Sequence, residues 1–234
     1  MGNCACEKEG TYNYPNGDYF KGTLKNDVPS GKGILYYKNG DIKYDGEFVK
    51  GKKQGLGKYY FSDYNWYVWE DGKKFYFLKG DYYFGQFLND SMHGKGIIYL
   101  SNGTIKCDGD FENNKFNGVG KYYFDKGGYY IGQLKDDMQH GKGKMYDKNG
   151  NIWLEGEFVN DHLNGIGKLY FESGYYISQF VNDKMVGKGK LYSNNGTLIG
   201  EFYYVNGKMV SAAKKENNMY NFMKYFDDRF HGFL

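Results

Sequence analysis

The sequence predicts an all-β fold, an elongated single-layer solenoid of about eight stacked β-hairpin repeats with a short C-terminal α-helix as its cap. At seven places in the 234-residue chain a Gly-x-Gly triplet begins nine residues after a glycine or, once, a serine. A tyrosine stands three residues after each triplet, and the triplets recur every 22 to 24 residues apart from one gap of 39. Such self-similarity indicates a repeat architecture. The opening residues and first triplet glycines are Gly22 and Gly31, Gly46 and Gly55, Gly85 and Gly94, Gly109 and Gly118, Gly132 and Gly141, Gly156 and Gly165, and Ser178 and Gly187.

Each unit has the pattern of a β-hairpin. In most units, large apolar side chains stand two residues before and two residues after the opening residue, and residues spaced by two share one face of a strand. An Asn/Asp-rich turn then leads into the Gly-x-Gly strand, for example 94–99. A second turn, often Asn-Gly, restarts the cycle, and Asn-Gly supplies the positive φ angles that tight hairpins need.

The repeat glycines require a physical reason, because glycine inside a strand normally weakens it. We expect the bare backbone at these positions, Gly118 and Gly141 among them, to let a Tyr or Phe ring from a neighbouring strand lie flat across it. The chain has 27 Tyr and 18 Phe, so such rings are expected to be the main packing element. Stacked hairpins then bury a continuous apolar strip that one hairpin alone cannot.

The unit resembles the MORN repeat (membrane occupation and recognition nexus). Tyr83-Phe84-Gly85-Gln86-Phe87 followed by His93-Gly94-Lys95-Gly96 is close to that family's consensus, and the resemblance covers roughly 18–208. An eighth unit, 198–202, shows only its first strand and is expected to act as a cap. The departures from the pattern are Cys107, Leu154, Leu198 and Ser178. The resemblance implies a scaffold at membrane–cytoskeleton junctions, the cell cortex, cilia or flagella.

The N-terminus, residues 1–10, is expected to be a flexible tail that carries lipid. Gly2 stands where N-myristoylation occurs once Met1 is removed, and Cys4 and Cys6 lie beside it for palmitoylation. A single myristoyl chain binds a membrane only marginally, so stable anchoring needs a second signal. A disordered tail without lipid is the alternative.

Two further segments depart from the repeat pattern. The gap of 39 residues holds an inserted hairpin, 63–81, with Trp66 and Trp69 around a turn. Either these tryptophans form a partner site, or the segment is a degenerate repeat whose rings pack on the neighbouring sheet. Residues 211–234 have apolar side chains at helical spacing and are expected to form an amphipathic helix. Such a helix most often covers the last edge strand, with a dimer contact or a membrane-surface helix as alternatives.

Composition excludes several classes of function. The net charge is +3 and evenly spread, so nucleic-acid binding is not expected. The chain lacks a long apolar run, so we expect no transmembrane helix, and three cysteines are too few for a disulfide framework, so we expect an intracellular protein. Histidines set one per repeat lie far apart, and no phosphate-binding loop or catalytic triad stands out. We expect no enzyme, metal or cofactor.

The function predicted from the sequence is therefore a scaffold on a cytoplasmic membrane face that binds a protein partner. Residues 11–210 are expected to form the repeat solenoid. Its partner surface is expected on exposed aromatic side chains, with Trp66 and Trp69 near one end. The repeat tyrosines assigned to this surface are Tyr60, Tyr99, Tyr123, Tyr146 and Tyr170. A structural subunit of a ciliary or cytoskeletal assembly and a phospholipid-binding module are the alternatives.

Overall fold

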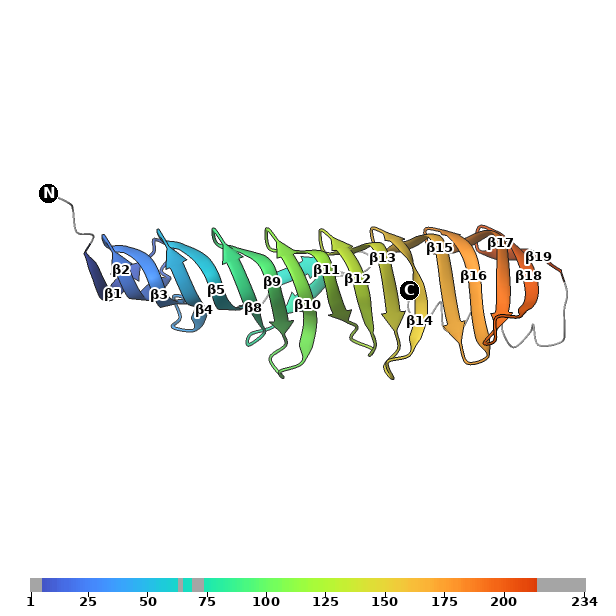
Figure 1. Ribbon diagram of the computed structural model, residues 1–234. Coiled ribbons are helices and arrows are strands. Elements are labelled where there is room, and N and C mark those ends of the chain that lie inside the picture. The colour runs from blue at the N-terminus through green and yellow to red at the C-terminus, as the bar shows by residue number, and fades with distance from the viewer. Residues whose placement is uncertain (1–5, 63–64, 69–73, 214–234) are drawn as a thin grey trace. The chain divides into compact units, whose positions relative to one another are not determined.

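The computed structural model describes residues 6–62, 65–68 and 74–213, and these residues form strands and turns without a helix (Figure 1). The chain divides into two compact units, Met1–Asn151 with Phe158–Asp161 and Ile152–Glu157 with His162–Leu234. An all-β fold built from antiparallel strands is thus confirmed. Strand β19 extends to Ala213, and the rest of the predicted C-terminal helix, 214–234, lies outside the described residues.

The first unit contains thirteen strands. They are β1 (Glu7–Asn13), β2 (Tyr19–Lys25), β3 (Val28–Tyr36), β4 (Ile42–Val49), β5 (Lys52–Tyr60), β6 (Asn65–Val68), β7 (Lys74–Phe77), β8 (Tyr82–Leu88), β9 (Ser91–Tyr99), β10 (Ile105–Glu112), β11 (Lys115–Tyr123), β12 (Tyr129–Lys135) and β13 (Met138–Tyr146). Strand β14 (Ile152–Val159) contributes residues to both units. The second unit continues with β15 (His162–Phe171), β16 (Gly174–Val181), β17 (Lys184–Ser193), β18 (Leu198–Val205) and β19 (Lys208–Ala213).

Within each unit the strands form an antiparallel meander. In the first unit the main-sheet strands β1 to β13 each pair with the next one, with β5 pairing with β8 across the insertion, and in the second unit β15 to β19 do the same. Strands β6 and β7 form a two-stranded sheet of their own, so the inserted hairpin predicted between β5 and β8 is present. Paired glycines hold the register, since each opening glycine faces the second glycine of a triplet, as in Gly85↔Gly96.

The two ends of the repeat differ from the prediction. Strand β1 begins at Glu7, so residues 7–10 are part of the sheet and not of a flexible tail; Gly10 faces Gly22, and the Thr23 hydroxyl donates to Glu9 at 2.9 Å. The eighth hairpin has a second strand, because β19 pairs with β18. Ser211 and Ala213 stand where the other hairpins have the triplet glycines, so the sequence of this strand lacks the Gly-x-Gly signal.

One face of each hairpin, here called the glycine face, carries the opening residue, the second triplet glycine and the buried rings. The Tyr83 ring lies over Gly85 and Gly96 so closely that a Cβ atom on either glycine would overlap it. Phe20, Tyr44 and Tyr130 cover their glycine pairs in the same way. Rings over glycines are therefore confirmed. Each ring comes from the neighbouring strand for the triplet glycine, as expected, but it also covers the opening glycine of its own strand.

Two departures from the repeat are compensated within their own hairpins. Cys107 is too small to cover Gly109 and Gly120, and the ring of Phe116, on the second strand, lies over both. Where Leu154 replaces the aromatic residue, Leu163 of β15 contacts Gly156. In these two hairpins the glycine face is thus filled by a side chain of the second strand.

Edge-to-face contacts join the rings of successive hairpins into one core. In the first unit the chain Phe20–Phe48–Tyr44–Phe87–Tyr83–Phe111 has centroid separations of 4.8 to 5.3 Å. All six rings are almost fully buried. The Tyr83 hydroxyl donates to the Gln86 carbonyl at 3.0 Å, and Tyr44 and Tyr130 make the equivalent bond. Buried hydroxyls need such a partner, and aromatic pairs of this geometry add stability beyond the area they bury.

The first glycine of each triplet has a different role from the one expected. Gly141 has φ +68° and Gly118 has φ +119°, a backbone region that side chains rarely adopt. A Cβ atom on Gly141 would meet the Gln133 side chain, and one on Gly118 would meet Asp110, so no ring lies over either residue. The expectation that an aromatic ring lies over Gly118 and Gly141 is wrong. These glycines form bulges, which bend and twist a strand pair.

The Asn/Asp turns tie each hairpin to the preceding one. The Asp137 N–H donates to the Phe116 carbonyl at 3.0 Å, and the Phe116 N–H donates to Asp137 Oδ1 at 2.7 Å. Pro29 has no N–H, and its partner turn residue is Gly51, which has no side-chain acceptor, so no bond is lost there. The same two-bond bracket recurs in Asp90 with Lys53, Asn114 with Met92, Asp161 with Gln139 and Asp183 with Leu163.

The two glycine roles predict different responses to substitution. Gly143→Ala should lower the free energy of unfolding by about 1–3 kcal/mol, because its methyl group overlaps the Tyr130 ring. Adding Tyr130→Leu should recover part of that loss relative to Tyr130→Leu alone. Gly141→Ala should also destabilise the chain, through its φ of +68°, but Tyr130→Leu should not rescue it. Urea unfolding of the single and double variants measures this, and equal rescue at both positions would contradict the ring-over-glycine packing.

The Asp137 bracket predicts a pH dependence. Burial raises the pKa of the Asp137 carboxyl to about 6 from an ordinary value of 3.8. The folded chain then holds this proton more tightly than the unfolded chain, so the group makes the free energy of unfolding fall as pH rises from about 4 to about 6. Asp137→Asn keeps an acceptor for Phe116, as Asn114 does for Met92, and should stabilise the chain by about 1–3 kcal/mol at pH 7. Near pH 3.5 its effect should vanish, and urea unfolding that shows a stability difference independent of pH would contradict this account.

Candidate binding surface

The repeat tyrosines lie on the face opposite the glycine face, here called the tyrosine face. Tyr60 faces Tyr82 while Tyr59 faces Tyr83, so strand alternation places Tyr60 and Tyr82 away from the buried rings. All seven repeat tyrosines are half-buried, and they pack against other tyrosine rings across the strands. In each triad the second and third rings are stacked and the first ring is tilted against the second. The groups are the pair Tyr19–Tyr36 and the triads Tyr60–Tyr82–Tyr99, Tyr123–Tyr129–Tyr146 and Tyr170–Tyr175–Tyr192.

A lysine lies over two rings of each triad. The Lys121 Nζ is 3.8 Å from the centroid of Tyr129 and 4.6 Å from that of Tyr123. Lys58 lies over Tyr82 at 3.7 Å, and Lys168 lies over Tyr175 at 3.9 Å. An ammonium group above a tyrosine ring is attracted by the negative face of the π system. The triads are therefore preorganised clusters of three rings and one cation.

Apolar side chains stay exposed beside each triad. The exposed fraction is 53% for Leu56 and 42% for Phe84 next to the first triad, and 55% for Val119 next to the second. Ile166 has the same place beside the third triad and is 57% exposed. Aromatic side chains are enriched at protein interfaces, so the rings and the exposed apolar groups make the tyrosine face a candidate binding surface.

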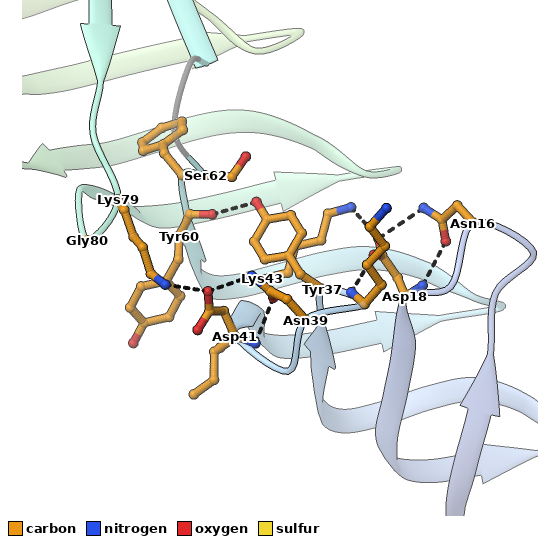
Figure 2. Close-up of a pocket in the computed structure, with 13 residues that line it drawn as sticks. Asn16, Asp18, Tyr37, Asn39, Asp41, Lys43, Tyr60, Ser62, Lys79 and Gly80 are labelled. Atoms are coloured by element: carbon orange, nitrogen blue, oxygen red, sulfur yellow. Dashed lines mark hydrogen bonds and ion pairs between the residues drawn. The ribbon is translucent and has the colours of Figure 1, made fainter.

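A pocket of about 650 Å³ lies in the first unit where the inserted hairpin leaves the sheet (Figure 2). Asp18 is buried there, and its carboxylate accepts the Lys43 ammonium at 2.7 Å and the Lys38 N–H at 3.2 Å. Burial by itself would raise the pKa of Asp18, but the hydrogen bonds and charge of Lys43 outweigh it and hold that pKa below its usual value.

A second ion pair lines the same pocket. Lys79, from the returning end of the insertion, forms an ion pair with Asp41 at 2.6 Å, and the Tyr37 hydroxyl donates to the Tyr60 carbonyl at 2.9 Å. Figure 2 shows these contacts around the opening. Asp18 is thus paired with Lys43, and Asp41 is paired with Lys79. We interpret the pocket as the place where the insertion is joined to the main sheet.

The structure places the predicted site residues in separate regions. Tyr60, Tyr99, Tyr123, Tyr146 and Tyr170 are all triad members. Trp66 lies in β6, whereas Trp69 lies outside the described residues. Cys6 is an exposed free thiol directly before β1, and Gly2 and Cys4 lie outside the described residues.

The sequence analysis did not identify the lysines that lie over the triads as residues of the candidate surface. Lys58, Lys121 and Lys168 each stand two residues before a repeat tyrosine, which is a visible signal. An even spread of charge along the chain hid it, because the sequence does not show which lysines share a face with the tyrosines. Only the strand register brings these residues together.

Two further features of the described residues concern metal binding and membrane spanning. Among residues 6–62, 65–68 and 74–213, no three His, Cys, Asp or Glu side chains are grouped so that they could hold a metal ion. The same part of the chain has no helix of the length and apolar character that crossing a bilayer demands.

Comparison with known proteins supports the repeat assignment. The family model for the MORN repeat matches seven segments, 20–42, 44–66, 83–105, 107–129, 130–152, 155–174 and 176–198. One solved structure that is similar to this chain is titled "Streptogramin B lyase structure", with 15% sequence identity over 84% of this chain and a TM-score of 0.18. The match covers 54% of that structure's chain, about half its length, and carries no argument about fold or function at this TM-score.

Proposed function

Because the chain belongs to the MORN-repeat family, we propose that it is a non-enzymatic scaffold that binds a protein partner through its tyrosine face and inserted hairpin. We propose further that N-terminal acylation holds it to a cytoplasmic membrane face, at the plasma or ciliary membrane or the cell cortex. The observation that carries the scaffold proposal is the repetition of the triads, with rings, a lysine and exposed aliphatic groups in the same places each time. Tyrosine and the other aromatic side chains are enriched at protein interfaces.

The anchoring proposal rests on Gly2, Cys4 and Cys6. The Cys6 carbonyl accepts the Asn26 N–H at 3.3 Å, so its backbone is tied to the first hairpin while its thiol is exposed. Cys107, by contrast, is buried, and burial raises the pKa of its thiol, so it is a poor acceptor of an acyl group. An acyl chain on Cys6 would hold β1 within one residue of the bilayer surface.

Fractionation tests the anchor. Gly2→Ala should move the protein from the membrane to the soluble fraction, since myristoylation requires that glycine. Cys4→Ala with Cys6→Ala should leave weak, reversible association, because one acyl chain binds with a constant of only about 10⁴ M⁻¹. Cys107→Ala is the matched control and should change neither fractionation nor thioester labelling. Membrane association that survives Gly2→Ala would reject the anchor and favour a structural subunit of a cytoskeletal or ciliary assembly, or lipid binding by the repeats.

Affinity capture tests the partner surface. The chain used as bait in an extract of the cells that express it should retain a defined partner. Trp66→Ala with Trp69→Ala should reduce that capture severalfold, because tryptophans often anchor interfaces. Thermal melting and membrane fractionation of the double variant should match wild type. Capture that persists in this variant would exclude the inserted hairpin as the partner site, and a bait that captures no protein would reject the scaffold proposal itself.

A further inference from the structure

Strands with acidic side chains and groups of strands without them alternate along the tyrosine face. In the first unit, β4 and β10 carry carboxylates on this face, Asp45 and Glu47 on the one and Asp108 and Asp110 on the other. The strands beside them carry lysines, so that Asp110 pairs with Lys95 at 2.7 Å. The groups β5–β8–β9 and β11–β12–β13, here called the basic bands, have a tyrosine triad and its lysine but no acidic residue on the tyrosine face.

The triad lysines point to the centres of the basic bands and away from the carboxylates. In register, Lys121 stands between Asp108 of β10 and Ile131 of β12, yet its Nζ lies over Tyr129 of β12. Lys58 likewise stands between Asp45 and Phe84 and lies over Tyr82. In the described residues neither lysine has a carboxylate within 4.0 Å. Each band therefore presents a cation without an ion-pair partner among the described residues, next to an exposed apolar side chain.

The second unit repeats this arrangement independently. Its strands β15–β16–β17 hold the third triad, Lys168 lies over Tyr175, and the neighbouring Ile166 is exposed. Glu155 and Glu157 of β14 and Glu201 of β18 carry the carboxylates on either side. The same composite of cation, rings and aliphatic group thus occurs in every second hairpin.

We propose that the basic bands dock an acidic segment of the protein partner, with carboxylates against the triad lysines and apolar side chains against residues such as Phe84 and Ile131. This inference rests on the scaffold function proposed above and specifies the chemistry of its partner. The centres of the two bands of the first unit, β8 and β12, are four strands apart, or about 19 Å at the usual strand spacing. A segment with two acidic clusters at that separation can occupy both bands at once and gain avidity.

The banding favours a polypeptide over an anionic bilayer. A bilayer presents a continuous negative surface, which would also face the carboxylates of β4 and β10 and be repelled by them. A polypeptide can place its acidic clusters on the basic bands and leave a neutral stretch above β10. Charge complementarity in register with the bands therefore identifies the occupant.

A designed peptide tests the proposal on the full-length protein. The probe is a fluorescent peptide with two Glu-Leu-Glu-Leu-Glu clusters joined by a ten-residue Gly-Ser linker, which spans about 18 Å. Lys58→Glu with Lys121→Glu should weaken its binding about tenfold or more, because like charges then face each other. Lys126→Glu with Lys148→Glu, in exposed turns, changes the net charge equally and should have little effect. Fluorescence anisotropy measures the affinities, with thermal melting as the folding check.

Two further measurements test whether the binding depends on the charge of the lysines. Lys58→Met with Lys121→Met keeps the aliphatic stems without the charge and should weaken binding less than the glutamate pair. Wild-type binding should fall as salt is raised from 50 to about 300 mM, because the contacts are between exposed charges. The proposal is overturned if the peptide does not bind at 1 mM, if both glutamate pairs weaken it equally, or if a Lys-Leu peptide binds as tightly.

Two results would distinguish this proposal from lipid binding by the repeats and from a partner site elsewhere on the chain. Phosphatidylserine vesicles that bind a Gly2→Ala protein through Lys58 and Lys121, without peptide binding, would replace the polypeptide by a lipid surface. A bait with Lys58→Glu and Lys121→Glu that still captures the wild-type partner would leave the scaffold function standing and reject the basic bands as its site.

Discussion

The packing of side-chain rings on bare backbone is the interaction on which this structure depends. A single-layer sheet has no second layer to cover its apolar face, so its core must form against the sheet itself. The paired glycines at Gly85 and Gly96 provide that space, and the Tyr83 ring fills it completely. Edge-to-face contacts then carry the core from one hairpin to the next. Where the usual ring is missing, as at Cys107, a ring from the second strand occupies the same space.

The bulges and the turn brackets make this packing possible. A flat sheet would leave a single row of rings exposed, whereas one bulge per hairpin, at glycines such as Gly141, adds twist and bends each strand pair. The brackets, such as Asp137 with Phe116, fix each turn to the preceding hairpin and so repeat the register along the unit. Burial of that carboxyl raises its pKa, which shows that the bracket has an electrostatic cost as well as a benefit.

Confining the core to the glycine face leaves the tyrosine face available for binding. Its rings are held in stacked triads, its lysines are held over the rings, and its aliphatic side chains stay exposed. Preorganised aromatic and cationic groups lose little conformational entropy when a partner binds, which suits them to recognition. The pocket beside the insertion differs, because Asp18, Lys43, Asp41 and Lys79 already satisfy one another.

The sequence by itself determined the hairpin repeat, its strand and turn positions and the presence of rings over glycines, because these follow from spacing within some 24 residues. It also gave the tyrosines of the candidate surface by number. Only the tertiary structure decided that one ring covers a glycine of its own strand as well as one of the neighbouring strand, that β1 and β19 complete the sheet ends, and that Gly141 lies at a bulge. It alone grouped the tyrosines into triads and placed Lys58, Lys121 and Lys168 over their rings. The reason is physical: cross-strand register and bulges set which side chains share a face, and neither is encoded in the spacing of any one residue type.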